Sequence, residues 1–351
     1  MQHYILSMLV VLSCVLVFIF SASITWLTRI YAVRKNILDI PNERSSHHVP
    51  IPRGGGIAIV LTFTVAVIGL GLRGLLDPNL MLAIVGGGIA IATIGYCDDV
   101  YTVKVRWRII THFLAAVWAI YWLHGFAILD LGTWTFTLNT IGSFFAIICI
   151  MWCINLYNFM DGIDGLAGSE GIFISLAGSL ALWLTYHHSM AFLMLLLAAA
   201  IAGFTVWNWP PAKIFLGDIG SGYLGYIFAV LSIYTANQGF VPIVFWIIVL
   251  AIFLCDTTFT LIGRAFQGKR WYAAHREHAY QNLISYGASH QHVTVCISMG
   301  NICIVLPLAF IALYQRQQAF WLLGSLLVAL FFAWSSIKSK TLIGWDFKGK
   351  I

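Results

Sequence analysis

Charged residues are scarce in this sequence. Lys, Arg, Asp and Glu together make up 9% of its 351 residues, whereas ordinary soluble domains carry about 25%. Hydrophobic residues make up 60% of the chain. This composition excludes an ordinary soluble protein and indicates a protein that lies largely within a membrane.

Cysteine spacing of the kind found in metal or redox sites is also missing. Most of the seven cysteines lie inside apolar runs, and no CxxC pair or Cys/His ligand spacing occurs. Cys149 and Cys153 share one helix face, and we interpret them as small buried hydrophobic residues. The sequence also shows no internal repeat, no low-complexity segment and no long linker. We therefore expect one membrane-embedded domain over residues 1–351.

Long apolar runs are what the sequence has in place of charge. Many approach the roughly 20 residues that cross a bilayer as a helix, whereas a barrel would show short alternating segments. The first run is too long for the apolar part of a signal peptide and lacks a small-residue cleavage site, so we expect it to be retained. The fold class predicted is an all-α polytopic integral membrane protein. Its eleven predicted spans lie near 4–28, 55–73, 80–97, 109–124, 139–156, 168–186, 190–207, 221–236, 240–262, 293–314 and 319–336.

The loops between these spans alternate in basic charge. Seventeen of the 19 basic residues fall on one side, and only Arg73 and Arg316 fall on the other. The positive-inside rule makes the basic side cytoplasmic. We therefore predict a periplasmic N-terminus and a cytoplasmic C-terminus in a bacterial inner membrane. The net charge of +6 is accordingly interpreted as an orientation signal, and no nucleic-acid partner is expected.

The carboxylates gather on the same side as the basic residues. Eleven of the 13 lie there, and only Asp77 and Asp130 do not. The positive-inside rule demands nothing of acidic residues, so a function must collect them. Seven of the eleven occur in five segments at the predicted cytoplasmic ends of the spans: "GYCDDVYTVK" with Asp98 and Asp99, "NLYNFMDGIDGLAG" with Asn158, Asp161 and Asp164, "NWPPAKIFLGDIGSG" with Asn208, Phe215 and Asp218, "FLCDTTFTLIGR" with Asp256 and Arg264, and "HREHAYQ" with His275, Glu277 and His278.

Each segment alone has an ordinary explanation, such as a solvated helix end, a glycine turn, a helix cap or a loop near lipid headgroups. Together they place six aspartates at one face, where like charges repel unless a cation lies between them. Carboxylate oxygens suit Mg²⁺ or Mn²⁺ better than zinc. Because Mg²⁺ usually takes one or two protein carboxylates and completes its shell with water and phosphate oxygens, only one or two of these aspartates should contact metal.

The neighbouring residues favour phosphate chemistry. Glycines in "DGIDG" and "LGDIGSG" let backbone N–H groups approach an anion, and the helices that follow add positive potential. Basic side chains on the same face are candidate partners for phosphoryl oxygens. They are Arg53, Lys104, Arg106, Lys213, Arg264, Lys269, Arg270 and Arg276. The pattern predicts a divalent cation and a phosphorylated substrate at the boundary between cytoplasm and lipid.

In order along the chain, "DIPNERSSHHVPIPRGGG", "DDVYTVK", "NLYNFMDGIDGLAG", "IFLGDIGSG" and "HREHAYQ" resemble the polyprenyl-phosphate N-acetylhexosamine-1-phosphate transferases. This is the family of the WecA- and WbpL-type enzymes and, more distantly, of MraY, and the resemblance covers essentially the whole chain. It implies a Mg²⁺-dependent transfer of a sugar 1-phosphate from a UDP-N-acetylhexosamine to undecaprenyl phosphate, which releases UMP. The product would initiate O-antigen or another lipid-linked glycan, and a homodimer is a family-level expectation.

The resemblance also implies roles for individual residues. The position of Asp218 holds Mg²⁺, with Asp99 as a second metal candidate. Asp98 and Asp99 lie beside the lipid phosphate and the diphosphate, and the histidine segment faces the sugar phosphates. The catalytic residues predicted in this way are Asp98, Asp99, Asp161, Asp164, His275 and His278. The substrate-binding residues predicted are Asn155, Asn158, Gly162, Asn208, Phe215, Lys104, Arg53, Arg264 and Arg276.

Several alternatives stay open. MraY-type enzymes carry three adjacent histidines, whereas Arg276 and Glu277 lie between His275 and His278 here, so the WecA/WbpL branch is favoured over the MraY reaction. A secondary transporter would place ionisable residues at mid-membrane in repeated halves, and a structural protein would give no reason for the carboxylates. The donor sugar, N-acetylglucosamine, N-acetylfucosamine or N-acetylquinovosamine, is not specified by these motifs.

Overall fold

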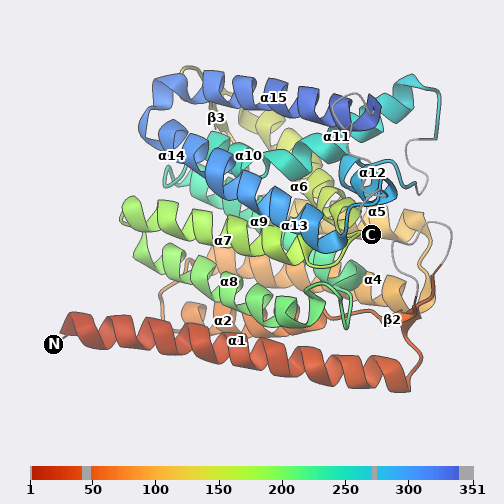
Figure 1. Ribbon diagram of the computed structural model, residues 1–351. Helices are drawn as coiled ribbons and strands as arrows, with labels where there is room; N and C mark the ends of the chain where they lie inside the picture. The colour runs from red at the N-terminus through yellow and green to blue at the C-terminus, as the bar shows by residue number, and fades with distance from the viewer. Residues whose placement is uncertain (1, 42–48, 271–274, 340–351) are drawn as a thin grey trace.

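A computed structural model describes residues 2–41, 49–270 and 275–339 of the protein. Arg44, His47 and His48, which belong to the segment "DIPNERSSHHVPIPRGGG" and to the predicted basic face, lie outside the described residues. The described chain is mainly helical, with the helices running side by side along one direction (Figure 1). In order, the helices are α1 (Gln2–Arg34), α2 (Ile57–Leu72), α3 (Pro78–Leu82), η1 (Ala83–Gly87), α4 (Gly88–Tyr101), α5 (Val105–Trp122), α6 (Asn139–Met160), α7 (Leu166–Leu184), α8 (His188–Asn208), α9 (Gly217–Asn237), α10 (Ile243–Val249), α11 (Ala251–Phe266), α12 (Ala279–Ser285), α13 (His290–Gly300), η2 (Asn301–Val305), α14 (Leu306–Tyr314), η3 (Arg316–Gln318) and α15 (Ala319–Ser339).

Every one of the eleven predicted spans is helical. Of the described helices, eight continuous stretches are long and apolar enough to cross a membrane. The pair α10 and α11, bent by 74°, gives a ninth if the two form one span. Helix α2, at 16 residues, is shorter. A polytopic helical membrane protein is thus confirmed, while the number eleven and the sidedness of the termini stay predictions.

Two small antiparallel hairpins interrupt the helical pattern. Strands β1 (Leu38–Asp39) and β2 (Ile51–Pro52) pair at one end of the bundle, and β3 (Ile128–Asp130) pairs with β4 (Thr135–Thr137) in another loop. These hairpins were not predicted, because strands of two or three residues are too short to show an alternating pattern.

Helix α9 is the central helix of the bundle. Every residue from Ile219 to Thr235 is buried, and α4 and α6 both pack closely along it. Helices α1 and α15 lie on opposite sides of the bundle (Figure 1) and leave most of their apolar side chains exposed or only partly buried, as helices in contact with lipid do. Because α4 and α6 end where α9 begins, the ends of three helices meet at one end of the bundle.

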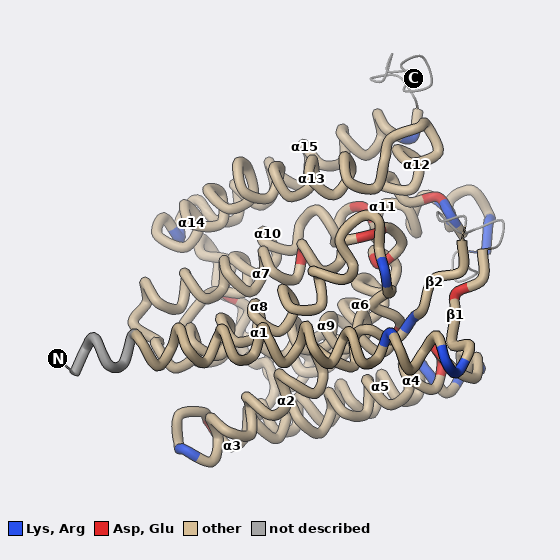
Figure 2. The backbone as a smooth tube through the Cα atoms, turned by 60° about the horizontal axis from the view of Figure 1, so that its bottom comes forward, with Lys and Arg blue, Asp and Glu red and all other residues tan. Residues whose placement is uncertain are grey.

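Charge is concentrated at this same end (Figure 2). The four charged residues that were predicted for the other side of the membrane lie at the opposite end of the bundle: Arg73 ends α2, Asp77 caps α3, and Arg316 pairs with Asp130 beside the β3–β4 hairpin. The division of charged residues between two ends therefore agrees with the sequence. We call the richly charged end the aspartate end.

Candidate active site

Asp99, near the end of α4, caps the beginning of α9. Its Oδ1 accepts a hydrogen bond from the backbone N–H of Asp218 at 3.0 Å, and its Oδ2 accepts one from Ile219 at 3.2 Å. The first N–H groups of a helix have no partner within the helix, and the helix dipole favours negative charge there. One carboxylate thus satisfies α9 and fixes Asp218, its neighbour in space from a distant segment.

Arg108 on α5 joins two further carboxylates. Its Nη1 lies 2.6 Å from Oδ2 of Asp98 and 3.2 Å from Oδ2 of Asp218. Asn158, at the end of α6, donates to Oδ1 of Asp218 at 2.7 Å and to the Ser221 hydroxyl at 3.0 Å. Four segments, α4, α5, α6 and α9, therefore converge on Asp218.

Asp161 is a carboxylate that burial and three neighbouring carboxylates disfavour in its charged form. It follows the last residue of α6 and is partly buried. Burial raises its pKa well above the usual range, and the negative charges of Asp218, Asp99 and Asp164 raise it further. Like charges have this effect when no cation separates them. We call Asp98, Asp99, Asp161 and Asp218 the aspartate cluster.

Two glycines let the backbone come this close. Gly217 has φ +77°, and a Cβ there would collide with the carboxylate of Asp99. A Cβ on Gly162 would collide with the Tyr280 hydroxyl, which donates to the Phe159 carbonyl at 2.9 Å. A residue with a side chain would strain the first position and displace the neighbour at the second.

The two aspartates of "DGIDG" have different surroundings. Asp164 is 8% exposed. Its Oδ2 accepts from the Ala212 N–H at 3.0 Å, and its Oδ1 lies 3.3 Å from Nδ1 of His290 on α13. The next N–H, from Gly165, donates to Oδ1 of the buried Asn208 at 3.0 Å. We call residues 161–165 the aspartate turn. It contains Asp161, a member of the aspartate cluster, and it ties Asp164 to other segments.

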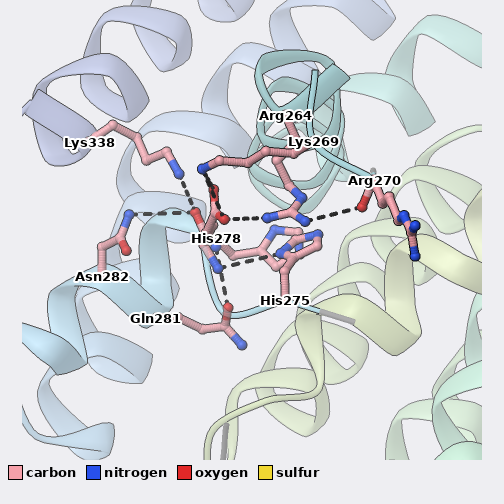
Figure 3. A network of polar contacts seen from close by, with 9 residues as sticks. Arg264, Lys269, Arg270, His275, His278, Gln281, Asn282 and Lys338 are labelled. Carbon is pink, nitrogen blue, oxygen red and sulfur yellow. Dashed lines mark hydrogen bonds and ion pairs between the residues drawn. The ribbon is translucent and has the colours of Figure 1, made fainter. Parts of the chain in front are cut away.

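Residues 275–278, which we call the histidine loop, are bound to α11 and α15 (Figure 3). Buried Arg264 of α11 pairs with Glu277, and Lys269 lies 3.2 Å from the same carboxylate. Lys338 of α15 donates to the Glu277 carbonyl at 2.6 Å. The basic residues Arg264 and Lys269, predicted as phosphate partners, are thus engaged with a carboxylate in this structure.

The two predicted histidines differ in exposure. His278 is 2% exposed and begins α12, whose first N–H groups, from Ala279 and Tyr280, donate to Asp256 at 2.7 and 3.1 Å. His275 is partly exposed, with its ring 4.9 Å from that of His278. Burial, His278 and Arg264 lower the pKa of His275 to about 4, so its imidazole is neutral near pH 7.

The remaining predicted residues differ in their contacts and in their exposure to solvent. Asn155 bonds its own helix at the Met151 carbonyl, 2.7 Å away. Phe215 is joined through its backbone to Pro52 and Gly55. Arg53 pairs with Asp39 at 2.7 Å and shares with Asp99 a largely apolar pocket of about 270 Å³ between α1 and α4. Lys104 is exposed where α5 begins, and Arg276 is partly buried in the histidine loop.

The donor set of the cluster fits Mg²⁺ or Mn²⁺ better than zinc. Within the described ranges, no group of three or more His, Cys, Asp and Glu side chains is arranged to hold a metal ion by itself. A structural or catalytic zinc needs at least three protein ligands, whereas Mg²⁺ is content with one or two carboxylates and completes its shell with water and phosphate oxygens. Asp161, whose pKa is raised by three neighbouring carboxylates, and Asp218, on which four segments converge, are the carboxylates whose surroundings best fit this role.

Two residues at the site were missed by the sequence interpretation. Arg108 was only counted among the 17 basic residues of the predicted cytoplasmic side, because nothing in the pattern says which face of α5 meets the aspartates. His290 lies in "GASHQHV", which matches no motif considered. Its ring could be found only from the fold, which brings α13 against the aspartate turn.

Comparison with known proteins gives a family and relatives. The family described as glycosyl transferase family 4 matches residues 81–236, which include the whole aspartate cluster. The chain is 29% identical over 280 residues to the probable undecaprenyl-phosphate N-acetylglucosaminyl 1-phosphate transferase of Bacillus subtilis (strain 168), covering 76% of this chain and 75% of the relative. It is 27% identical over 327 residues to the undecaprenyl-phosphate alpha-N-acetylglucosaminyl 1-phosphate transferase of Salmonella typhi, covering 90% and 87%. It is 26% identical over 332 residues to the decaprenyl-phosphate N-acetylglucosaminephosphotransferase of Mycobacterium tuberculosis (strain CDC 1551 / Oshkosh), covering 86% and 82%.

Proposed function

We propose, from the match to glycosyl transferase family 4 over residues 81–236 and the similarity to the relatives named above, that the protein transfers an N-acetylhexosamine 1-phosphate from a UDP-linked sugar to undecaprenyl phosphate. The products are a lipid-linked diphosphosugar and UMP. Relatives from three bacterial genera are named for the same transfer to a polyprenyl phosphate. We place the reaction on the cytoplasmic side of the inner membrane, where it starts O-antigen or another lipid-linked glycan.

The observation that carries the proposal is the convergence of carboxylates and Arg108 on the beginning of α9. Asp98 and Asp99 of α4 and Asp218 of α9 come from helices far apart in sequence, and they are joined through Arg108 and by the hydrogen bond from the Asp218 N–H to Asp99. Carboxylates gathered in this way repel one another unless a cation lies between them, and such arrangements are typical of functional sites. Its place at the charged end of a membrane bundle suits a donor from water and an acceptor from lipid.

The attacking group in this proposal is an oxygen of the lipid phosphate. The second pKa of a phosphate monoester is about 6, so this oxygen is already largely deprotonated near neutral pH and a general base is optional. It forms a bond to the sugar-proximal phosphorus of the donor, and the bond from that phosphorus to UMP breaks. The main obstacle is then the repulsion between two polyanions.

The residues of the site act on that repulsion. Asp218 and Asp161 would hold Mg²⁺, which when bound neutralises charge on the diphosphate and on departing UMP. Asp99 orients Asp218 through the N–H groups of α9, and its role as a second metal ligand stays a prediction. Arg108 keeps Asp98 and Asp218 together and offers its remaining N–H groups to phosphoryl oxygens.

A donor panel tests this function. Purified protein is given undecaprenyl phosphate, Mg²⁺ and, one at a time, radiolabelled UDP-N-acetylglucosamine, UDP-N-acetylfucosamine, UDP-N-acetylquinovosamine and UDP-N-acetylmuramoyl-pentapeptide. We expect lipid-soluble label and one equivalent of UMP with one of the first three donors. Transfer only from the pentapeptide donor would assign the MraY reaction, and label that enters sealed vesicles without reaching lipid would assign transport.

A further inference from the structure

Helix α13 holds the aspartate turn through two side chains on one face. His290 and Thr294 are four residues apart, so they lie above one another on the helix. Nδ1 of His290 lies 3.3 Å from both the backbone nitrogen and Oδ1 of Asp164. The Thr294 hydroxyl, fully buried, donates to the Asp164 carbonyl at 3.0 Å. One helix thus contacts the amide, the carboxylate and the carbonyl of a single residue.

The imidazole is the specific part of this contact. Oδ1 of Asp164 is buried and has no hydrogen-bond partner in the described part of the chain, and Nδ1 of His290 lies 3.3 Å from it. A protonated Nδ1 of His290 can donate to it, and an unprotonated Nδ1 can instead accept the Asp164 N–H. An aliphatic side chain would do neither and would leave a buried carboxylate oxygen unpaired, which is costly.

The position of Asp164 connects this contact to the proposed chemistry. Its Oδ2 is already bound by the Ala212 N–H, at 3.0 Å, in the loop that leads into α9. Asp161, three residues earlier in the same turn, belongs to the aspartate cluster. Holding Asp164 in place therefore also holds Asp161 and Gly162 in position for the substrates. Helix α13, which provides this contact, lies outside residues 81–236, the segment matched by the family.

We infer that His290 is a positioning residue: with Thr294, it clamps the aspartate turn so that Asp161 keeps its place in the aspartate cluster. The inference rests on the proposed function for its effect on turnover, but the clamp itself can be measured without activity. His290 contacts Asp164 and not the reacting groups, so its loss should lower kcat more than it changes KM for the donor.

The test compares four variants in the full-length protein. His290→Leu removes the ring nitrogen, whereas His290→Asn keeps a polar group near the position of Nδ1. Thr294→Val keeps the shape of Thr294 without its hydroxyl. His292→Leu is the matched control, since His292 is an exposed imidazole on the same helix that contacts Ser289 instead. Hydrogen–deuterium exchange of the amides of residues 161–165 is measured first, followed by kcat and KM.

We expect exchange in the aspartate turn to become about tenfold faster or more in His290→Leu, as for the loss of one hydrogen bond to a charged group. We expect kcat to fall about 10- to 100-fold, His290→Asn to recover most of both losses, and His292→Leu to match the wild type. Should His290→Leu fail to fold, His290→Asn and Thr294→Val provide the exchange test, with faster exchange expected in Thr294→Val.

Two results would overturn the clamp. One is unchanged exchange in the turn for His290→Leu and Thr294→Val. The other is equal damage from His290→Leu and His290→Asn, because the bulk of the ring, and not its nitrogen, would then be what matters. If the wild type transfers no sugar phosphate, the proposed function fails, while the exchange measurements still decide whether α13 holds the turn.

Discussion

Arg108 gives the sharpest test of the aspartate cluster. It is the one cation seen to touch two of the cluster's carboxylates among the residues that the structure describes, Asp98 at 2.6 Å and Asp218 at 3.2 Å. In Arg108→Leu the methylene stem is largely replaced, but the charge is lost, so Asp98 and Asp218 face each other without compensation. Turnover should fall because the cluster must then rearrange before it can hold a cation and a diphosphate.

The size of the effect follows from the exposure of the partners. Breaking a fully buried ion pair costs about 3–5 kcal/mol, and an exposed pair contributes about 0–1 kcal/mol. The side chain of Arg108 is 27% exposed, and those of Asp98 and Asp218 are 12% and 30% exposed. An intermediate value of about 2–3 kcal/mol, if it falls on the barrier, lowers kcat about 30- to 160-fold.

The assay is the initial rate of lipid-linked product at saturating donor and Mg²⁺. Arg108→Lys should give an intermediate rate, since lysine keeps the charge but cannot reach two carboxylates with a rigid fork. Arg34→Leu is the control, because it removes an exposed charge from α1 at the same end of the bundle. Near wild-type turnover in Arg108→Leu, with correct insertion, would refute the role given to this cation.

Three further predictions concern the metal and the histidine loop. Transfer should cease in EDTA and return with Mg²⁺ or Mn²⁺, and Asp218→Asn should lose at least about 100-fold at any Mg²⁺ concentration; full transfer in EDTA would contradict the metal assignment. His275→Ala should lower turnover steeply without loss of insertion, and a normal rate would make the loop a lipid-surface feature. Acid should loosen the histidine loop. Burial, His278 and Arg264 lower the pKa of His275 to about 4 in the folded protein, whereas the same imidazole in an opened loop has an ordinary pKa of about 6.5. Between these two pH values the opened loop binds more protons than the folded one, so the stability of the folded loop falls as the pH drops from about 6.5 to about 4. Glu277 acts in the same direction at lower pH, because Lys269 and Arg264 outweigh burial and lower its pKa; amide protection of the loop, corrected for intrinsic exchange, should therefore fall from pH 6.5 to 4, and constant protection would contradict it.

The helices could be predicted from sequence because apolar runs near 20 residues have few alternatives in a membrane. Every predicted span is helical for this reason, and the family resemblance was confirmed. The convergence of Asp98, Asp99 and Asp218 was also expected, since segments that end on one side of a membrane share a plane. What the plane does not specify is which side chains meet within it.

The features that were not predicted depend on contacts between distant segments. The bend between α10 and α11 at Leu250 lies inside an apolar run, and residues 243–262 contain no proline or glycine to signal it. The burial of His278 depends on Asp256, which caps α12 from another helix. Arg108 and His290 depend on the rotation of α5 and the placement of α13, and neither rotation nor placement is written in a hydropathy pattern.

The spacing of the two aspartates in "DGIDG" has a physical explanation in this fold. In a continuous helix, residues three apart share a face, so both carboxylates would point the same way and repel. Here α6 ends at Met160 and α7 begins at Leu166, so the five residues between them are not helical. Asp161 can therefore join the aspartate cluster while Asp164 bonds to Ala212 and approaches His290. The motif thus combines Asp161, a residue for the proposed chemistry, with Asp164, which anchors it. Replacing Asp164 should therefore impair transfer even though its carboxylate is turned into the protein.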